Sequence, residues 1–428
     1  MSSHPFQLDS VGACSRTLVQ RTGPVPKSFI GGTHRAVSPE ETFNRVKPLM
    51  GLLGITRIAD VTGLDCIGIP VAMAFRPNAR SLAVSPGKGL DLAAAKTSAV
   101  MESLEGWHAE RILLPLVLGS YNELRFERRI AALQRLPQRS VGELTEHTRM
   151  LWIEGRNLLS DTTSYVPFEV VHTNYTLPLP PSSGAFVASS NGLASGNHLL
   201  EAISHAICEL VERDATTLWH GLDRPARAQT LLDLSTVDDP ACVMVLEQFE
   251  RAGVAVGVWE TTSDLGIPAF RCIITDKDPS PLRPHLPGVG AGCHPTREVA
   301  LLRALTEAAQ VRLTLISGAR DDMGLAQYTR AADHDLHRGL VTEITNGANR
   351  DFRKVNSFVS DTFDDDLRWQ LERLSAAGID EVIAIDLTKP AIGIPVVRVV
   401  IPGLEGIHDA PGYRGGARYQ KQLQAGKN

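Results

Sequence analysis

The strongest constraint on the fold of this chain is that its sequence repeats itself. One phrase occurs three times, beginning at Leu53, Ala252 and Ala377, and contains a strand-like run, a polar turn, Gly-Ile-Pro and a second β-branched run. Two such runs joined by a short polar loop are typical of a β-hairpin, and proline is tolerated where the second strand begins. A helical segment precedes each copy. The sequence therefore predicts three helix-then-hairpin units.

A second repeated phrase predicts three helices with acidic side chains at matching places. Its copies are GKGLDLAAAKTSAVMESLEGW, SGNHLLEAISHAICELVER and GCHPTREVALLRALTEAAQVR, with apolar residues at helical spacing. Asn197 is expected to cap the middle helix. Aligned without gaps, one position holds Glu102, Glu209 and Glu307, and the position three residues later holds Glu105, Glu212 and Gln310. Residues three apart lie on one helix face, so each pair can point at one spot.

An acidic helix face is most often a solvated surface, but the neighbours of these glutamates favour a site. Small residues surround the first pair: Ala94, Ala95, Ser98 and Gly106. A solvated face would be richer in Lys, Asp and Glu. Carboxylates in a sequestered place repel one another unless cations lie between them, and Mg²⁺ is a hard cation commonly held by carboxylates together with phosphate oxygens. The pattern favours a metal–phosphate site over three helices that merely pack.

A phosphate cradle is predicted in front of the first acidic helix, at Ser85–Gly89 (SPGKG). Gly-Lys-Gly offers backbone N–H groups and the Lys88 cation close to a helix that Asp91 could cap. The stretch lacks the spacing of a P-loop, and such a tripeptide alone is usually an ordinary turn. Its position just ahead of Glu102 and Glu105 is what suggests contact with phosphate.

Composition excludes several classes of protein. A net charge of −5 argues against a nucleic-acid binder, and no apolar run approaches the length of a membrane span. The six cysteines form no C-x-x-C pair, which weakens both a disulfide framework and a structural zinc site. The first residues lack the charged-then-apolar pattern of a signal peptide, so a cytoplasmic location is expected.

Together these phrases resemble the YcaO domain, a family of ATP- and Mg²⁺-dependent enzymes that activate peptide backbone amides. The resemblance runs from about Gly54 to Arg418 and rests on SPGKG, SAVMESLE, NGLASGN, CELVERDA, GAGCHPTREVALLRALTEAAQVR and VVIPGLEG. It implies an α/β (mixed α+β) fold of internally repeated helix–hairpin units, with an ATP–Mg cleft lined by three acidic helices. The expected organisation is an N-terminal extension (1–50), a catalytic domain (51–418) and a flexible C-terminal tail (419–428).

The resemblance extends to individual motifs, with three departures. The family's Ser-x3-Glu-x-x-Glu-Arg pattern is similar to Ser98, Glu102 and Glu105, with Gly106 in place of the arginine. Its Gln-x3-Glu-x-x-Glu-Arg pattern is similar to Glu209, Glu212 and Arg213, with His205 in place of the glutamine. A Ser-x6-Glu pattern reaches Glu201, with Ala194 in place of the serine.

These motifs imply a role for each matching residue. The implied metal ligands are Glu102, Glu105, Glu201, Glu209 and Glu212. The implied catalytic residues are Glu105, Glu212 and Arg213. The implied ATP contacts are Ser85, Lys88, Ser98, Asn197, His205, Glu307, Gln310 and Arg312.

The resemblance implies a reaction that begins with phosphorylation of an amide oxygen. Attack by a substrate Cys, Ser or Thr side chain then gives an azoline, attack by sulfide gives a thioamide, and attack by an amine gives an amidine. The chain ends in GGARYQKQLQAGKN rather than in the proline-rich tail of many azoline-forming members. Its phrase from Gly32 is most similar to members that work beside a TfuA-type partner. We therefore expect thioamide formation on a precursor peptide or protein, with a separate TfuA-like partner and a homodimeric enzyme.

Other interpretations remain open. Azoline formation by a cyclodehydratase is the first alternative. The second is a carboxylate-metal hydrolase in which the glutamates hold two metals and activate water without ATP. The third is a scaffold that binds ATP without turnover. His198 and His294, each near the entrance of an acidic helix, could contact phosphate or transfer protons, although a loop histidine is more often a surface residue.

Overall fold

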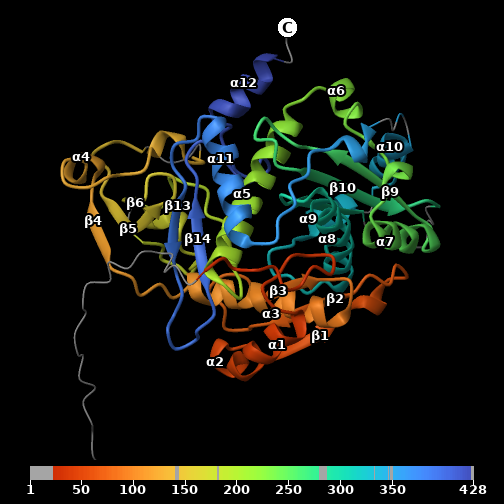
Figure 1. Ribbon diagram of the computed structural model, residues 1–428, viewed down its shortest axis with the longest axis horizontal. Helices are drawn as coiled ribbons and strands as arrows, with labels where there is room; N and C mark the ends of the chain where they lie inside the picture. The colour runs from red at the N-terminus through yellow and green to blue at the C-terminus, as the bar shows by residue number, and fades with distance from the viewer. Residues whose placement is uncertain are drawn as a thin grey trace, which may run out of the picture.

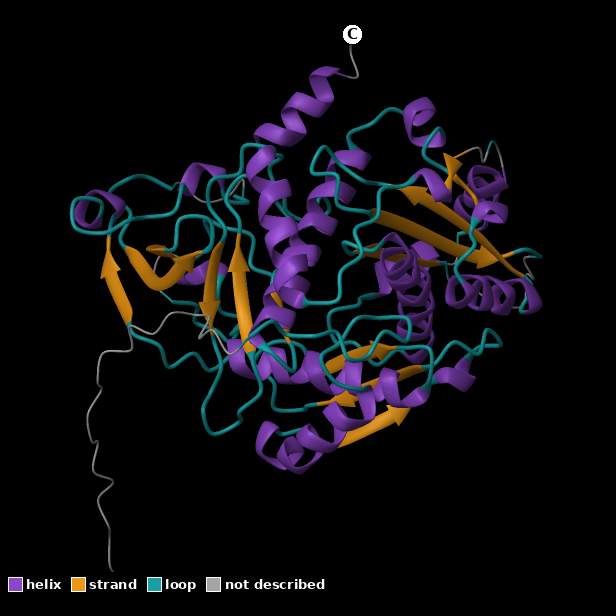
Figure 2. Ribbon diagram, in the orientation of Figure 1, coloured by secondary structure: helices purple, strands orange, loops and turns teal. Residues whose placement is uncertain are grey.

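The computed structural model describes residues 23–139, 144–180, 183–278, 287–331, 333–345, 347 and 350–425. The helices are α1 (Pro39–Val46), α2 (Met50–Leu53), α3 (Leu92–Ala109), α4 (Tyr121–Leu124), α5 (Leu199–His220), α6 (Arg224–Ala228), α7 (Pro240–Arg251), α8 (Arg297–Ser317), α9 (Leu325–Ala331), α10 (His334–Thr345), α11 (Phe363–Ala376) and α12 (Ala417–Ala425). The strands are β1 (Arg57–Asp60), β2 (Val71–Phe75), β3 (Val84–Lys88), β4 (Leu116–Gly119), β5 (Met150–Asn157), β6 (Thr162–Pro167), β7 (Leu193–Ser195), β8 (Leu232–Asp233), β9 (Val254–Glu260), β10 (Ala269–Asp276), β11 (Gly288–Cys293), β12 (Arg350–Asp351), β13 (Ile383–Asp386) and β14 (Val396–Val400). Figure 2 shows helices and strands intermixed throughout the molecule.

The three predicted hairpins are all present. β1 pairs antiparallel with β2, β9 with β10, and β13 with β14. In each unit a third antiparallel strand joins the second hairpin strand: β3 joins β2, β11 joins β10, and β7 joins β14. That third strand precedes an acidic helix, which is α3, α8 or α5. Each unit thus consists of a leading helix, a hairpin, a third strand and an acidic helix.

The third unit is assembled in a different chain order. Its third strand and acidic helix, β7 and α5, precede its leading helix and hairpin, α11, β13 and β14, in the sequence. Figure 1 shows the blue C-terminal strands beside the yellow-green α5. The sheet of this unit is extended to the order β4-β5-β13-β14-β7, with β6 also paired to β5. The C-terminal hairpin therefore completes a unit begun in the middle of the chain.

Glycines allow the acidic helices to lie directly on their strands. A Cβ atom on Gly290 of β11 would lie only 2.2 Å from the backbone oxygen of Ala304 in α8. One on Gly87 of β3 would lie 2.1 Å from the backbone nitrogen of Ala99 in α3. No side chain fits at either position, so close backbone contact fixes where each helix sits along its strand.

The predicted cap of α5 was wrong. The capping residue of α5 is His198, whose Nδ1 accepts a hydrogen bond from Leu200 N at 3.1 Å. The side chain of Asn197 instead accepts a hydrogen bond from Thr42 of α1. The predicted phosphate cradle at Ser85–Gly89 is mostly strand β3, which lies at the edge of its sheet, where Pro86 needs no outward ladder donor. Asp91 does cap α3 as predicted, accepting from Ala94 N at 2.7 Å.

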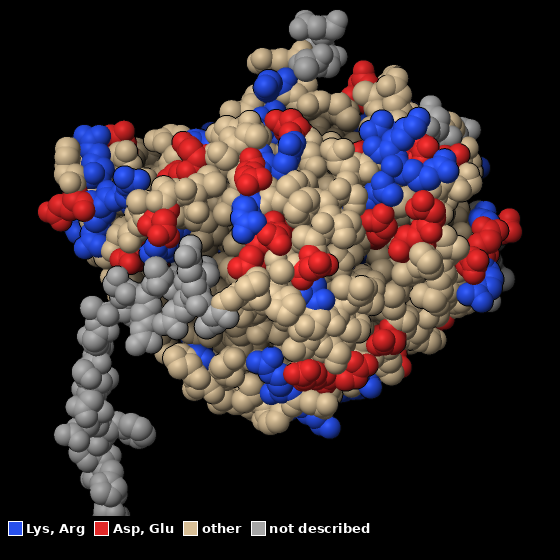
Figure 3. Space-filling model, viewed as in Figure 1, with Lys and Arg blue, Asp and Glu red and all other residues tan. Residues whose placement is uncertain are grey.

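The ends of the described chain pack on the acidic helices. α1 contacts α3, and α12 contacts α5, where Arg418 Nη2 lies 2.9 Å from Asp214 Oδ2. The proposed limits at residues 50 and 418 stay predictions. No helix within the described ranges is long and apolar enough to cross a membrane. On the face in Figure 3, acidic and basic side chains form small groups of both signs.

Candidate active site

Glutamates from all three acidic helices interact with one another. Burial, together with the charges of Glu209 and Glu307, raises the pKa of Glu102 to about 7. Burial and the charges of Glu307 and Glu209 likewise raise the pKa of Glu212 to about 7. Lys88, at the end of β3, places its Nζ 2.6 Å from Glu307 Oε2. We call the five residues Glu102, Glu105, Glu209, Glu212 and Glu307 the glutamate cluster.

Most carboxyl groups of the cluster are stabilised in their protonated form. Burial raises the pKa of Glu105 to about 8, and it also raises the pKa of Glu209. Glu307 is the exception: burial acts to raise its pKa, but Lys88 and Arg213 more than offset that effect and lower it. The side chain of Glu102 is exposed to solvent, and the side chains of the other four glutamates are half-buried or buried. The cluster thus carries more acid than its surroundings neutralise, at a place a ligand can reach.

Backbone groups next to α5 orient two of these carboxylates. Ser195 donates to Glu105 Oε1 from its backbone N at 2.8 Å and from its Oγ at 2.7 Å. Gly192 N donates to Glu209 Oε2 at 3.3 Å. Because Glu105 belongs to α3 and Ser195 to β7, these bonds join the first unit to the third.

The donor set of the cluster fits Mg²⁺ with phosphate oxygens. Its ligands are carboxylate oxygens, which Mg²⁺ prefers, and a divalent cation would stabilise the ionised carboxylates that burial and neighbouring charges now disfavour. Lys88 and Arg213, whose Nη1 lies 3.4 Å from Glu212 Oε1, are cations able to meet phosphate oxygens at the border of the cluster. These residues therefore fit the metal–phosphate site expected from the sequence, and their contacts with Mg²⁺ and phosphate stay predictions.

Other predicted ATP contacts lie around the cluster. Gln310 donates from Nε2 to Pro86 O at 2.9 Å and so joins α8 to β3. His205 Nε2 lies 2.5 Å from Arg303 Nη2, and burial lowers its pKa well below the usual value, which keeps the ring neutral. Ser85 is buried in β3, and Ser98 lies one helical turn before Glu102. Their contacts with ATP stay predictions.

Glu201 and Asn197 belong to a separate group at the start of α5. Glu201 accepts hydrogen bonds from the backbone N of Ala36 at 3.1 Å and of Asn197 at 3.2 Å, and Arg35 Nη1 lies 3.3 Å away. Asn197 Oδ1 accepts from Thr42 Oγ1 at 3.0 Å. Eight residues separate Glu201 from Glu209, about 12 Å along the helix. Its predicted role as a metal ligand is therefore not supported by contact with the cluster, and stays a prediction.

Arg312, a further predicted ATP contact, is engaged on another side of α8. Its Nη2 lies 2.9 Å from Asp276 Oδ1 and its Nε 3.5 Å from Asp65 Oδ2. These acids come from β10 and from the loop before β2. The side chain thus joins two units, and its contact with ATP also stays a prediction.

Two arginines near the cluster were not among the predicted site residues. Arg303 lies one turn before Glu307 on α8, and its charge acts to lower the pKa values of Glu209 and Glu212. Arg398 of β14 is 3 % exposed and donates from Nη2 to Ser189 O at 2.9 Å. Spacing of four residues from Glu307 could have revealed Arg303, and the single charge in the run VVRVV could have revealed Arg398.

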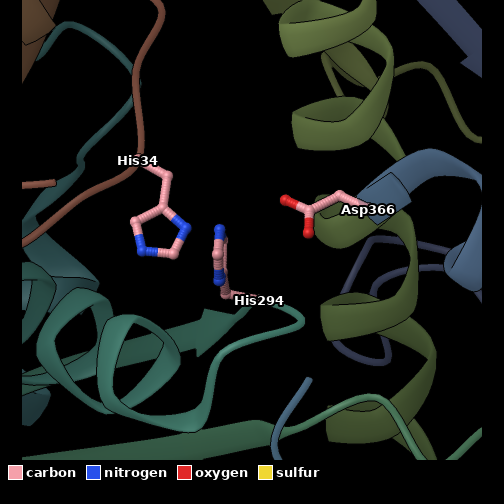
Figure 4. Close-up of side chains that lie close together, drawn as sticks. All are labelled: His34, His294 and Asp366. Atoms are coloured by element: carbon pink, nitrogen blue, oxygen red, sulfur yellow. The ribbon is translucent and has the colours of Figure 1, made fainter. Parts of the chain in front are cut away.

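A second group of potential metal ligands, His34, His294 and Asp366, lies outside the cluster (Figure 4). Their ligand atoms are within 4.8 Å of one another. However, Lys27 Nζ lies 2.8 Å from one oxygen of Asp366 and 2.7 Å from the other. A divalent cation here would lie beside an ammonium group, and the carboxylate is already neutralised. We assign no metal to this group.

Comparison with known proteins decides the family. Residues 86–405 match the sequence profile described as YcaO cyclodehydratase, ATP- and Mg²⁺-binding. That match covers most of the chain and includes every residue of the glutamate cluster. The chain belongs to the YcaO family. ATP and Mg²⁺ are accordingly the cofactors of its family, in agreement with the donor set described above.

Curated relatives of this YcaO protein cover nearly its whole length. It is 37 % identical over 379 residues to a protein encoded in the tfuA 3′ region of Rhizobium leguminosarum bv. trifolii, covering 87 % of this chain and 88 % of the relative. It is 34 % identical over 383 residues to a protein of Methanothermobacter thermautotrophicus, covering 87 % and 95 %.

Solved structures confirm the mixed α/β fold predicted for this YcaO chain. The YcaO structure from Methanopyrus kandleri, bound with AMPPCP and Mg²⁺, has a TM-score of 0.70 at 23 % identity and covers 92 % of this chain and 99 % of that one. A heterocyclase in complex with substrate and cofactor has a TM-score of 0.72 at 24 % identity. It covers 90 % of this chain, which spans only 54 % of the heterocyclase chain.

The raised pKa values predict how stability depends on pH and on Mg²⁺. Folded Glu102, Glu105 and Glu212 hold protons that the unfolded chain has already released, so raising the pH from about 7 to about 8.5 should lower the melting temperature of the ligand-free protein. ATP with Mg²⁺ should raise the melting temperature and weaken this dependence, while ATP with a chelator should do neither. Thermal melts at the two pH values test this. Equal shifts by ATP with and without Mg²⁺ would contradict the shared site.

Proposed function

We propose that this YcaO protein uses ATP and Mg²⁺ to phosphorylate a backbone amide oxygen of a ribosomally made peptide or protein, and that sulfide then replaces the oxygen to give a thioamide. The observation that carries the proposal is the convergence of glutamates from three helices beside Lys88. Phosphorylation makes the amide oxygen a leaving group. One ATP and one sulfide are consumed, and ADP, phosphate and the thioamide are released.

The contribution of the chain itself is to position charged groups. The glutamate cluster would hold Mg²⁺, with Glu105 oriented by Ser195 and Glu209 by Gly192. Lys88, Arg213 and Arg303 are the nearby cations that could meet phosphate oxygens. Because phosphoryl transfer requires in-line placement and neutralisation of charge, these groups are of the kind expected to accelerate it.

The thioamide branch is supported by a relative rather than by the geometry of the cluster. The Rhizobium relative is named for its place in the tfuA 3′ region, which favours a TfuA-like partner that delivers sulfur or substrate. Azoline formation is the alternative, favoured by the cyclodehydratase description of the family and by the heterocyclase structures. Both products require the same activated amide, so the cluster serves either one.

The mass of the modified peptide distinguishes these products. We expect a precursor peptide incubated with the enzyme, ATP, Mg²⁺, sulfide and the partner protein to gain the mass difference between sulfur and oxygen. Attack by a side chain would instead remove water and lower the mass. A water-loss product formed without sulfide would refute thioamide formation but not amide activation. Hydrolysis of the peptide without ATP would refute both and favour a metal hydrolase.

A further inference from the structure

A pocket separate from the glutamate cluster lies at the C-terminal end of α3. Its volume is about 470 Å³, and its lining includes Trp107, Ile112 and Phe168 together with Arg80 and Lys389. The residues come from the end of α3, the loop after β2, the turn after β6 and the loop between β13 and β14. The pocket therefore lies where the first and third units meet.

The pocket carries a positive charge. Glu110 is the acidic residue that lines the pocket, and its charge is already neutralised. Nη1 and Nη2 of Arg76 each lie 2.6 Å from one of its carboxylate oxygens, and Arg111 Nη1 lies 2.7 Å from Oε2. Lys389 and Arg111 lie over the Trp107 ring at 5.7 and 5.3 Å from its centroid. Arg80 adds a further exposed cation. An anionic group entering this pocket would meet cations that the protein itself does not fully neutralise.

One wall of the pocket holds a buried donor without an acceptor. His172 is 5 % exposed, and its Nδ1 accepts a hydrogen bond from Asn174 N at 3.1 Å. Burial lowers the pKa of His172, so the ring is neutral and its proton is on Nε2. That Nε2 has no partner in the part of the chain that the structure describes. A buried donor left unpaired is unfavourable, and a ligand acceptor that reached this nitrogen would offset that cost.

We propose that this pocket binds an acidic side chain of the peptide substrate. The mixture of cations with Trp107, Phe168 and Ile112 suits a carboxylate carried on methylene groups. Leu113 and Leu114, which follow Ile112, are 87 % and 39 % exposed and extend the apolar surface outward for neighbouring peptide residues. This inference rests on the proposed function, because it assumes that the substrate is a peptide.

Binding of a short probe peptide tests the pocket directly. The probe is acetylated, amidated Gly-Gly-Glu-Gly-Gly, with its glutamine counterpart as the neutral control, observed by saturation-transfer NMR in the presence of AMPPCP and Mg²⁺. We expect the signal of the glutamate peptide to be at least about threefold stronger. Arg80→Gln and His172→Phe should each reduce it to the level of the glutamine peptide. Lys47→Gln, which removes an exposed cation on another surface, should leave it unchanged.

Three outcomes would overturn the inference: equal signals from the two peptides, a glutamate signal that survives both variants, or its complete displacement by an equal concentration of inorganic phosphate. Arg80 is exposed, so its variant keeps the test valid even if His172→Phe fails to fold. Melting shifts with ATP and Mg²⁺ separate the two hypotheses. If ATP with Mg²⁺ raises the melting temperature but the glutamate peptide does not bind, the pocket hypothesis is refuted and the proposed function is not. If the glutamate peptide binds but ATP with Mg²⁺ leaves the melting temperature unchanged, the proposed function is refuted and the pocket hypothesis is not.

Discussion

Changing Glu209 to glutamine is expected to lower ATP turnover by at least about 100-fold while leaving the fold intact. Glutamine keeps the shape of the side chain and can still accept the hydrogen bond from Gly192, but it loses the charge that would hold Mg²⁺. Glu307→Gln should have a similar effect, because it also leaves Lys88 without its ion-pair partner. ADP release under saturating ATP, Mg²⁺ and substrate is the measurement.

The matched control for these variants is Glu247→Gln, which changes an exposed glutamate on α7 and should leave turnover unchanged. Glu201→Gln is the informative comparison. If Glu201 acts mainly by binding the backbone of Ala36 and Asn197, its variant should be less damaging than Glu209→Gln. Normal turnover in Glu209→Gln or Glu307→Gln would mean that the helix concerned is only structural.

Changing Lys27 to methionine is expected to lower the free energy of unfolding by about 3–5 kcal/mol. The Lys27 and Asp366 side chains are 1 % and 0 % exposed, so the variant would leave a carboxylate buried without its cation. The same lysine fixes the N-terminal segment to the start of α11, since its backbone N also donates to Asp361 O at 2.9 Å. Urea denaturation followed by circular dichroism measures the change.

The double variant Lys27→Met/Asp366→Leu should recover much of the lost stability, because replacing both partners of a buried ion pair by apolar groups is often neutral. Lys354→Met, at an exposed lysine, is the control and should change stability little. A small loss of stability in Lys27→Met, or no recovery of stability in the double variant, would mean that water reaches the ion pair. That result would contradict the burial of both side chains in the structure.

The hairpins could be predicted from sequence because each contains its own turn signal and β-branched runs. The third strands could not. β3 and β11 are rich in glycine and proline, residues with low strand propensity, and they form strands because helices α3 and α8 pack against them. The pairing that completes the unit of α5 could not be predicted either, because β7 pairs with β14, which lies about 200 residues further along the chain.

The glutamate cluster was predictable because three-residue spacing and gap-free alignment place its members on matching helix faces. Spacing alone, however, does not say which charged neighbours reach that face. Arg398 directly precedes the phrase VVIPGLEG on β14, but nothing in that phrase relates it to the acidic helices, and only the fold brings it near Glu209. Glu201 shares a helix with Glu209, but two turns separate them and backbone groups already bind its carboxylate, so its role as a metal ligand stays a prediction.

The altered chain order of the third unit has a consequence for biosynthesis. A ribosome adds about 5–20 residues per second, so β14 emerges about 10–40 seconds after β7, the strand it must pair with. Until then α5 has no strand β14 to pack on, and Glu209 and Glu212 lack their final surroundings. The nascent chain therefore carries an unfinished acidic helix while about 200 further residues are added. Nucleotide binding by this protein should begin only after β14 has been made and has paired with β7.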